Sequence, residues 1–397
     1  MLNSPFSPWP SFTREEADAV SRVLLSNRVN YWTGEECREF EREFAAFAQT
    51  EYAVALANGT VALDIALKAL GVGPGDEVVV TPRTFVASAS SIVNAGAQPV
   101  FADVDPNSQN ITAETIAAAL SVNTRAIICV HLAGWPCDMD PIMALARERG
   151  LFVIEDCAQA HGATYKGRPV GSIGDIGAWS FCQDKIMTTG GEGGMVTTND
   201  RDLWQFMWSF KDHGKSWQAV YEREHPPGFR WLHEAAGTNW RMTEIQAAIG
   251  RIQLRRMPEW SAARRRNARQ IWDCARALPG LRVPTVPDDI EHGAYKCYVF
   301  VEPEQLPAGV DRDSVMAAIN AAGVPCYSGS CSEVYLEGVF QGQVKALGPG
   351  GGVLGPENRL PVARELGETS LMFLVHPTLT DDELEKTCEV IAGVMAK

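Results

Sequence analysis

The chain has 397 residues, 46% of them hydrophobic, and a formal net charge of −14 at pH 7. Such a chain can bury a large core, and its length favours more than one domain. The acidic charge argues against nucleic acid and acidic membranes as partners, because both normally require a basic surface on the protein. The N-terminal sequence MLNSPFSPWPSF lacks the cationic and apolar regions of a signal peptide, and no uncharged apolar stretch reaches membrane-spanning length.

The cysteines and histidines lack the spacing of a metal site. The ten cysteines include no CxxC pair, and the seven histidines include no close pair at helical metal-ligand spacing. We therefore expect no metal, reduced thiols and a cytoplasmic location.

From about residue 53 to residue 200, short β-branched runs alternate with helical patterns. The expected strands are EVVVTP (77–82), PVFADVD (99–105), RAIICVHLAG (125–134) and LFVIED (151–156). The expected helices are FVASASSIVNAGA (85–97), TAETIAAAL (112–120) and DPIMALARERG (140–150). This alternation predicts an α/β fold, with a mostly parallel sheet flanked by helices on both faces. Because such sheets bind ligands beyond the carboxyl ends of their strands, Asp156 is a candidate site residue.

The second half of the chain predicts a loop, a long helix and a smaller domain. Residues 211–237 are polar, aromatic and rich in His, Gly and Pro, which is typical of a long functional loop. Residues 243–278 predict a helix that is broken near Pro258. We interpret Arg264–Arg266 as a solvated face of this helix, with a diphosphate contact as the alternative.

The helical stretch is expected to connect two domains. The segment YKCYVFVEP (295–303) predicts a strand and DRDSVMAAINAAG (311–323) a helix of a small α+β domain. We therefore predict an N-terminal arm and large domain over residues 1–255, and a small C-terminal domain over residues 256–397.

Four elements of the large domain fit the chemistry of pyridoxal 5′-phosphate (PLP). Lys185, in AWSFCQDKIMTTGGEGGM, could form a Schiff base with the cofactor, and Asp156 could keep its pyridine nitrogen protonated. Gly59 and Thr60 begin a helix that could hold the phosphate, and Phe85 could stack on the ring. Each feature has a structural alternative: Asp156 could cap a helix, Phe85 could lie in the core, and GGEGG could be a hinge. Their joint occurrence at successive strand ends favours the site.

Several longer motifs point to one family. They are ANGTVAL, TFVASASSIVNAGAQPVFADVD, VIEDCAQAHGA, GDIGAWSF followed by the lysine and GGEGGM, and GTNWRMTEIQAAIG. Over nearly its whole length the chain resembles the DegT/StrS-type aminotransferases, which are fold-type I PLP enzymes that mostly aminate nucleotide-linked keto-sugars. The resemblance implies a homodimer with a shared active site.

The resemblance also implies a role for each matching residue. Lys185 would carry the Schiff base, and Asp156 would pair with the pyridine nitrogen. Gln159 would hydrogen-bond near the phenolic oxygen, and Phe85 would stack on the ring. The implied phosphate ligands are Gly59, Thr60, Ser180 and, from the partner subunit, Asn239.

The implied reaction is the transfer of an amino group from L-glutamate or glutamine to a keto-sugar in amino-sugar biosynthesis, such as that of lipopolysaccharide or antibiotic sugars. The freed amine of Lys185 would move the proton between the donor and the cofactor, and the kinetics would be ping-pong. A lysine at this position favours transfer over dehydration, because dehydratases of the family carry His there. Two alternatives stay open: a cyclitol or aminobenzoate-precursor acceptor, and a regulatory protein that binds PLP without turnover.

Overall fold

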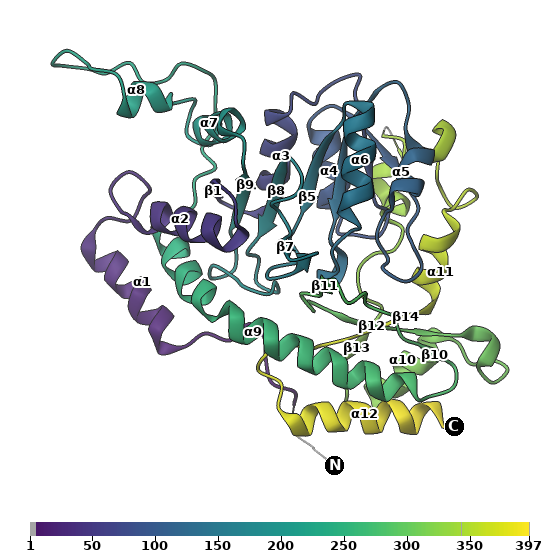
Figure 1. Ribbon diagram of the computed structural model, residues 1–397. Coiled ribbons are helices and arrows are strands. Elements are labelled where there is room, and N and C mark those ends of the chain that lie inside the picture. The colour runs from purple at the N-terminus through teal and green to yellow at the C-terminus, as the bar shows by residue number, and fades with distance from the viewer. Residues whose placement is uncertain (1–4, 343, 397) are drawn as a thin grey trace.

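A mixed sheet forms the centre of the computed structural model, which describes residues 5–342 and 344–396 (Figure 1). Within these residues the sheet has seven strands in the order β1-β9-β8-β5-β4-β2-β3. The strands are β1 (Tyr52–Leu56), β2 (Glu77–Val80), β3 (Gln98–Phe101), β4 (Thr124–Val130), β5 (Phe152–Asp156), β8 (Ile176–Ser180) and β9 (Gly194–Thr198). The run from β3 to β8 is parallel, whereas β9 is antiparallel to both of its neighbours. The prediction of a mostly parallel sheet is confirmed.

Helices cover both faces of this sheet because its strands carry apolar side chains in both directions. On β1, Val54 and Leu56 belong to the core shared with α3, whereas Ala53 and Ala55 belong to the core shared with α2. Alternate residues of a strand point to opposite faces, so each face is sealed by its own helical layer. The helices next to the sheet are α2 (Glu36–Ala48), α3 (Gly59–Ala69), α4 (Ala87–Asn94), α5 (Ala113–Ala119), α6 (Met139–Arg149) and α7 (Arg201–Phe210).

One long helix, α9 (Glu244–Arg276), runs from the region of α1 (Arg14–Ser26) and α2 to the C-terminal helix α12 (Asp381–Met395) (Figure 1). The predicted break at Pro258 is wrong, because the helix continues through this residue. Proline removes one backbone hydrogen bond and strains the preceding turn. Here α9 packs against α1, α2 and α12, and buries residues on either side of the proline, including Met257 and Trp260. This packing holds the helix together.

The C-terminal part forms a separate small core around an antiparallel sheet. Its strand order is β10-β12-β14-β13. The elements of this part are β10 (Leu281–Arg282), β12 (Cys297–Val301), β13 (Cys326–Tyr327), β14 (Ser370–Phe373), α10 (Arg312–Ala321), α11 (Pro361–Thr369) and α12. The predicted strand and helix of this region correspond to β12 and α10. The expected domain boundary after residue 255 falls inside α9, whose buried residues Ala268 and Ile271 belong to this small core.

Short elements complete the structure. A third sheet joins β11 (Ile290–Glu291), β6 (Thr164–Tyr165) and β7 (Arg168–Pro169). The 3-10 helices are Leu132–Gly134, Pro303–Gln305, Val334–Leu336, Gly338–Phe340 and Pro349–Gly351. None of the helices in the described part of the chain combines the length and apolar character that crossing a membrane requires.

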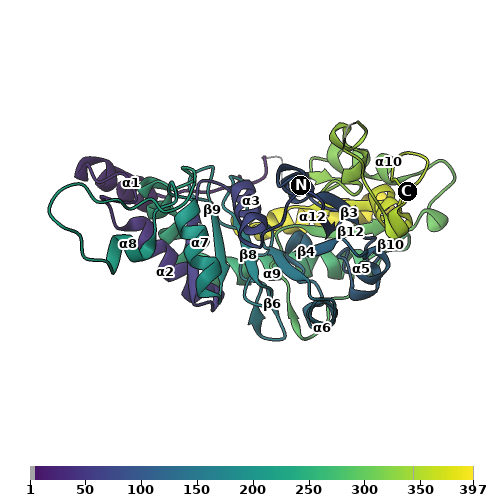
Figure 2. The ribbon, with the colours of Figure 1, turned by 90° about the horizontal axis from the view of Figure 1, so that it is seen from above.

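The predicted loop at 211–237 contains one short helix, α8 (Trp217–Tyr221), and extends away from the body of the molecule. Figure 2 shows this extension at the opposite end from α10. The segment exposes two large aromatic side chains, Phe229 at 77% and Trp231 at 80%.

Candidate active site

A cavity of about 610 Å³ lies between the start of α3 and the carboxyl ends of β5 and β8. Its lining includes Gly59, Thr60, Phe85, Asp156, Gln159, Ser180 and Lys185. The structure therefore brings together every site residue that the sequence predicted, except Asn239. The cavity lies at the end of the parallel strands, where ligands of such sheets bind.

The start of α3 is built for an anion. Asn58 caps the helix, since its Oδ1 accepts a hydrogen bond from Val61 N at 3.0 Å. Gly59 lies directly against Ser180, and a Cβ on this glycine would come within 2.5 Å of the Ser180 Cβ. This approach places the serine hydroxyl beside the free N–H groups of the first helical turn. Those N–H groups and the helix dipole favour a phosphate.

Asp156 is a buried carboxylate at the end of β5, only 5% exposed. Its Oδ2 accepts from Ser88 Oγ at 2.8 Å and its Oδ1 from Ala158 N at 3.1 Å. Burial raises the pKa of Asp156, although these hydrogen bonds and the charge of Lys185 act in the opposite direction. A ligand with a protonated ring nitrogen, bound in the cavity, would offset the free-energy cost of burying this carboxylate.

Lys185 lies between a tyrosine and a carboxylate. Its Nζ is 3.5 Å from Tyr295 Oη and 3.5 Å from Asp184 Oδ1, and the Tyr295 hydroxyl donates to the other oxygen of Asp184. Burial alone would raise the pKa of Asp184, but the Lys185 charge and the Tyr295 hydrogen bond outweigh it, so the pKa lies below its ordinary value. Trp9, in the N-terminal segment before α1, donates from its Nε1 to the carbonyl oxygen of Lys185 at 2.8 Å. The lysine is thus fixed on a short segment with its amine at the cavity.

Two further side chains can contact a planar ring in this cavity. Gln159 accepts from Ala133 N through Oε1 at 2.9 Å, which leaves its NH₂ group as a donor. Phe85 is 66% exposed although it is a large apolar side chain. An exposed aromatic face at the edge of a cavity is suited to stacking on a flat ligand.

Asn239 lies elsewhere in the described chain. It follows the projecting segment and forms an isolated β-bridge with Asp212. It is not part of the lining of the cavity in its own subunit. Its action from a partner subunit stays a prediction.

Sequence reasoning missed Ser88 and Tyr295. Ser88 lies within a predicted helix, one turn after Phe85, but nothing in the pattern indicated a contact with Asp156. Tyr295 is 110 residues from Lys185 and precedes a strand of the small domain, so only the packing of the two parts reveals their contact.

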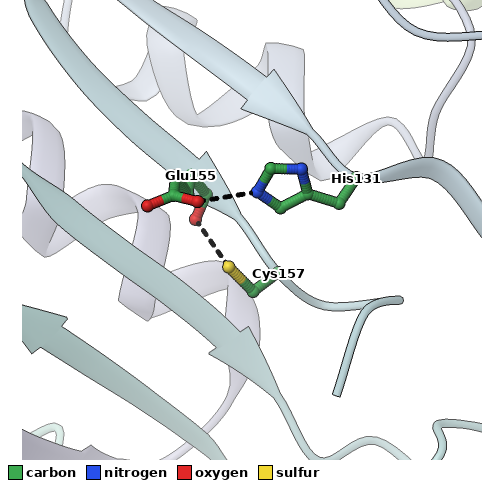
Figure 3. A group of neighbouring side chains, drawn as sticks. All are labelled: His131, Glu155 and Cys157. Carbon is green, nitrogen blue, oxygen red and sulfur yellow. Dashed lines mark hydrogen bonds and ion pairs between the residues drawn. The ribbon is translucent and has the colours of Figure 1, made fainter. Parts of the chain in front are cut away.

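Figure 3 shows a buried polar cluster that includes Glu155 and Cys157, the two chain neighbours of Asp156. His131, Glu155 and Cys157 place potential ligand atoms within 4.8 Å of one another. The ring nitrogens of His131 are already engaged, since Nδ1 accepts from Cys137 N at 3.0 Å and Nε2 lies 2.9 Å from Glu155 Oε2. Burial raises the pKa of the Cys157 thiol well above its ordinary value, which disfavours the thiolate that metals bind. We interpret this cluster as a hydrogen-bonded support for the end of β5.

The described residues fit PLP. The cavity offers an anion site at the start of α3, a buried carboxylate at Asp156, an exposed aromatic face and a lysine amine. A family model described as the DegT/DnrJ/EryC1/StrS aminotransferase family matches residues 10–392. The chain belongs to this family.

Individual members of the family support the same conclusion. An aminotransferase from Psychrobacter cryohalolentis of known structure is 64% identical, with a TM-score of 0.93 and 99% of each chain covered. The GDP-perosamine synthase of Caulobacter vibrioides is 48% identical over 315 residues, which are 79% of this chain and 81% of that protein. A putative sugar aminotransferase from Streptococcus pneumoniae, solved in its PLP form, is 26% identical, with a TM-score of 0.85 and coverage of 100% of this chain and 99% of that one.

These similarities confirm the family resemblance found in the sequence. The DegT/DnrJ/EryC1/StrS protein described here is a PLP-dependent aminotransferase of the sugar aminotransferase family, with the fold-type I architecture.

Proposed function

We propose that this aminotransferase moves an amino group from L-glutamate or glutamine to the ketone of a nucleotide-linked sugar, with Lys185 as the catalytic residue. The observation that carries the proposal is the meeting of Lys185, Asp156 and the start of α3 in one cavity. A nucleotide-linked acceptor is supported by the relative named GDP-perosamine synthase.

Bound PLP would supply an electron sink and would hold the amino group between the two half-reactions. The residues of the chain would orient it. Asp156 would face the pyridine nitrogen and keep it protonated, and the Gln159 NH₂ group would donate to the phenolic oxygen. Gly59, Thr60 and Ser180 would hold the phosphate, and Phe85 would cover one face of the ring.

The catalytic proton transfers would belong to Lys185. In its free, neutral form the amine of Lys185 would act as the base that removes the proton from the donor α-carbon, and in its protonated form as the acid that gives the proton back. Tyr295 and Asp184 lie 3.5 Å from this amine and would restrict its movement.

The proposed working form is a homodimer in the cytoplasm. Asn239 of one subunit would complete the phosphate site of the other, which agrees with its absence from the cavity lining of its own subunit. All ten cysteines are free thiols, as a reducing compartment would keep them.

Spectroscopy of the bound cofactor tests the proposal. Glutamate or glutamine should convert the visible absorbance of PLP-loaded protein to that of the pyridoxamine form, and a nucleotide-linked keto-sugar should restore it. Lys185→Ala should bind PLP but reduce the conversion rate by at least about a thousandfold, because the proton-transfer group is gone. Lys345→Ala, at an exposed lysine, is the matched control.

The same assay separates the alternatives. Restoration of absorbance by free cyclitol ketones alone would replace the nucleotide-linked sugar with a cyclitol acceptor. A wild-type protein that binds PLP but is converted by neither donor would instead be a regulatory PLP-binding protein.

A further inference from the structure

A second cavity, of about 530 Å³, adjoins the first. Asp184 lines both cavities, and Tyr295, which contacts the Lys185 amine, lines the second. The second cavity is also lined by Trp9, Arg264, Lys296 and His376. A ligand that reaches Lys185 past Tyr295 can therefore extend into it.

The central feature of this cavity is the guanidinium of Arg264. Its residue is 1% exposed, so the sequence-based expectation of a solvated helix face is wrong for this arginine. Its Nε and Nη2 have no hydrogen-bond partner among the described residues. Burial lowers the pKa of Arg264 to about 9. Burying a cation without hydrogen-bond partners raises the free energy of the folded protein. A ligand that pairs with Arg264 would remove this penalty and so bind more tightly.

The surroundings hold Arg264 in place without neutralising it. Its guanidinium lies 4.8 Å from the centre of the Trp9 ring, and that ring also stacks on His376. Aromatic stacking fixes the plane of the guanidinium and leaves its edge free for hydrogen bonds.

The charges that line the cavity favour an anion. Lys296 adds a second cation, with its Nζ 5.1 Å from the Tyr295 ring. The carboxylate of Asp184 already accepts from Tyr295 and lies beside Lys185, so it is not available to Arg264 as a close partner.

We propose that Arg264 binds a carboxylate of the amino donor and positions the donor amine toward Lys185. This assignment rests on the proposed function. A carboxylate matches the planar, two-pronged edge of a guanidinium, and both glutamate and glutamine carry one next to the reacting amine.

The position of Arg264 favours the donor over other anions. The cofactor phosphate has its own site at the start of α3, and Arg264 does not line that cavity. In a nucleotide-linked sugar, the sugar itself separates the diphosphate from the ketone. Arg264 shares its cavity with Tyr295 and Asp184, both of which contact the reacting lysine, so it is better placed for the short donor than for the diphosphate.

Calorimetric titration of the PLP-loaded protein tests the site without turnover. Glutarate serves as the probe, because it has the carboxylates of glutamate but no amine, and GDP serves as the diphosphate probe. Arg264→Met should weaken glutarate binding about tenfold or more, since a charge-assisted pair is lost, and should leave GDP binding unchanged. Arg266→Met, at an exposed arginine of the same helix, should change neither.

Two further measurements keep the test decisive. Arg264→Lys retains the charge without the planar fork; it is used if Arg264→Met fails to fold, and its melting temperature reports on packing. In stopped-flow absorbance, this variant should need about tenfold more glutamate for half-maximal conversion, while the sugar half-reaction keeps its concentration dependence.

Unchanged glutarate binding in folded Arg264 variants would overturn the site, and weakened GDP binding with unchanged glutarate binding would assign it to the diphosphate instead. If glutamate and glutamine both fail to convert the wild-type protein, the proposed function fails. If they convert the wild type and the Arg264 variants equally, only the donor site fails.

Discussion

At the scale of single residues, burial keeps the imidazole of His161 neutral. This ring packs against the strand end that precedes Lys185. The side chain is fully buried, and the ring packs against Trp179 and Phe181. Burial, and then the charges of Lys185 and Arg264, lower the pKa of His161 to about 3. The folded protein therefore keeps this imidazole neutral, whereas the unfolded chain binds a proton near the ordinary pKa of about 6.5.

Replacing His161 should reduce the acid sensitivity of folding. Below pH 6.5 the unfolded state binds a proton that the folded state does not, so stability falls as the pH decreases toward 3. At pH 4.5 the resulting loss in the free energy of unfolding is about 3 kcal/mol. His161→Phe keeps the ring packing and removes the proton, so its urea midpoint should fall less between pH 7.5 and pH 4.5 than that of the wild type.

His233→Phe is the matched control, because this histidine is exposed. Equal losses of stability in the wild type and in His161→Phe would show that the imidazole is not held neutral by the fold.

The residues of the site differ in how far the sequence predicts them. Lys185, Asp156 and Gly59 follow strands or begin a helix, so the periodicity of the chain places them at one edge of the sheet. Arg264 and Tyr295 reach the same region from α9 and from the segment before β12. Their positions depend on how the small core packs on the large one, and no local pattern encodes that packing.

At the scale of secondary-structure elements, the close approach of α3 to β8 depends on the absence of a side chain at Gly59. Gly59→Ala would place a Cβ 2.5 Å from the Ser180 Cβ and 2.9 Å from its Oγ. The start of α3 must then move away from the serine, which separates the groups of the proposed phosphate site. PLP affinity, measured by absorbance titration, should fall about tenfold or more, because charge-assisted hydrogen bonds are lost.

Gly338→Ala controls for the effect of adding a methyl group, since a Cβ there would meet nothing within 4 Å. Wild-type PLP affinity in Gly59→Ala would mean that α3 and Ser180 do not hold the phosphate together.

The sequence predicts helices and strands correctly where the local pattern of apolar residues agrees with the packing of the fold. The runs that became β2 to β5 are short, apolar and bounded by polar residues, and the sheet buries them as expected. Pro258 shows the opposite case. Its local preference predicts a break, but the helices packed along α9 outweigh the roughly 3 kcal/mol that an internal proline costs.

At the scale of the whole molecule, the projecting segment with α8 is the surface that we assign to the proposed homodimer. It extends from the body and exposes Phe229 and Trp231, and Asn239 follows it in the chain. Large exposed aromatic side chains are typical of association surfaces. The proposed homodimer would cover them and would bring Asn239 to the cavity of the partner.

Mixed dimers test this arrangement through complementation. Asn239→Ala should lower activity about tenfold or more through loss of a hydrogen bond to the charged phosphate, and Lys185→Ala should be nearly inactive. If Asn239 acts across the interface, a dimer of one subunit of each variant contains one site with both defects and one site with none. A heterodimer purified through two different tags should therefore recover about half of the wild-type rate, because one of its two sites is intact. If Asn239 acts within its own subunit, both sites carry a defect, and the heterodimer would be no more active than the average of the two variant homodimers.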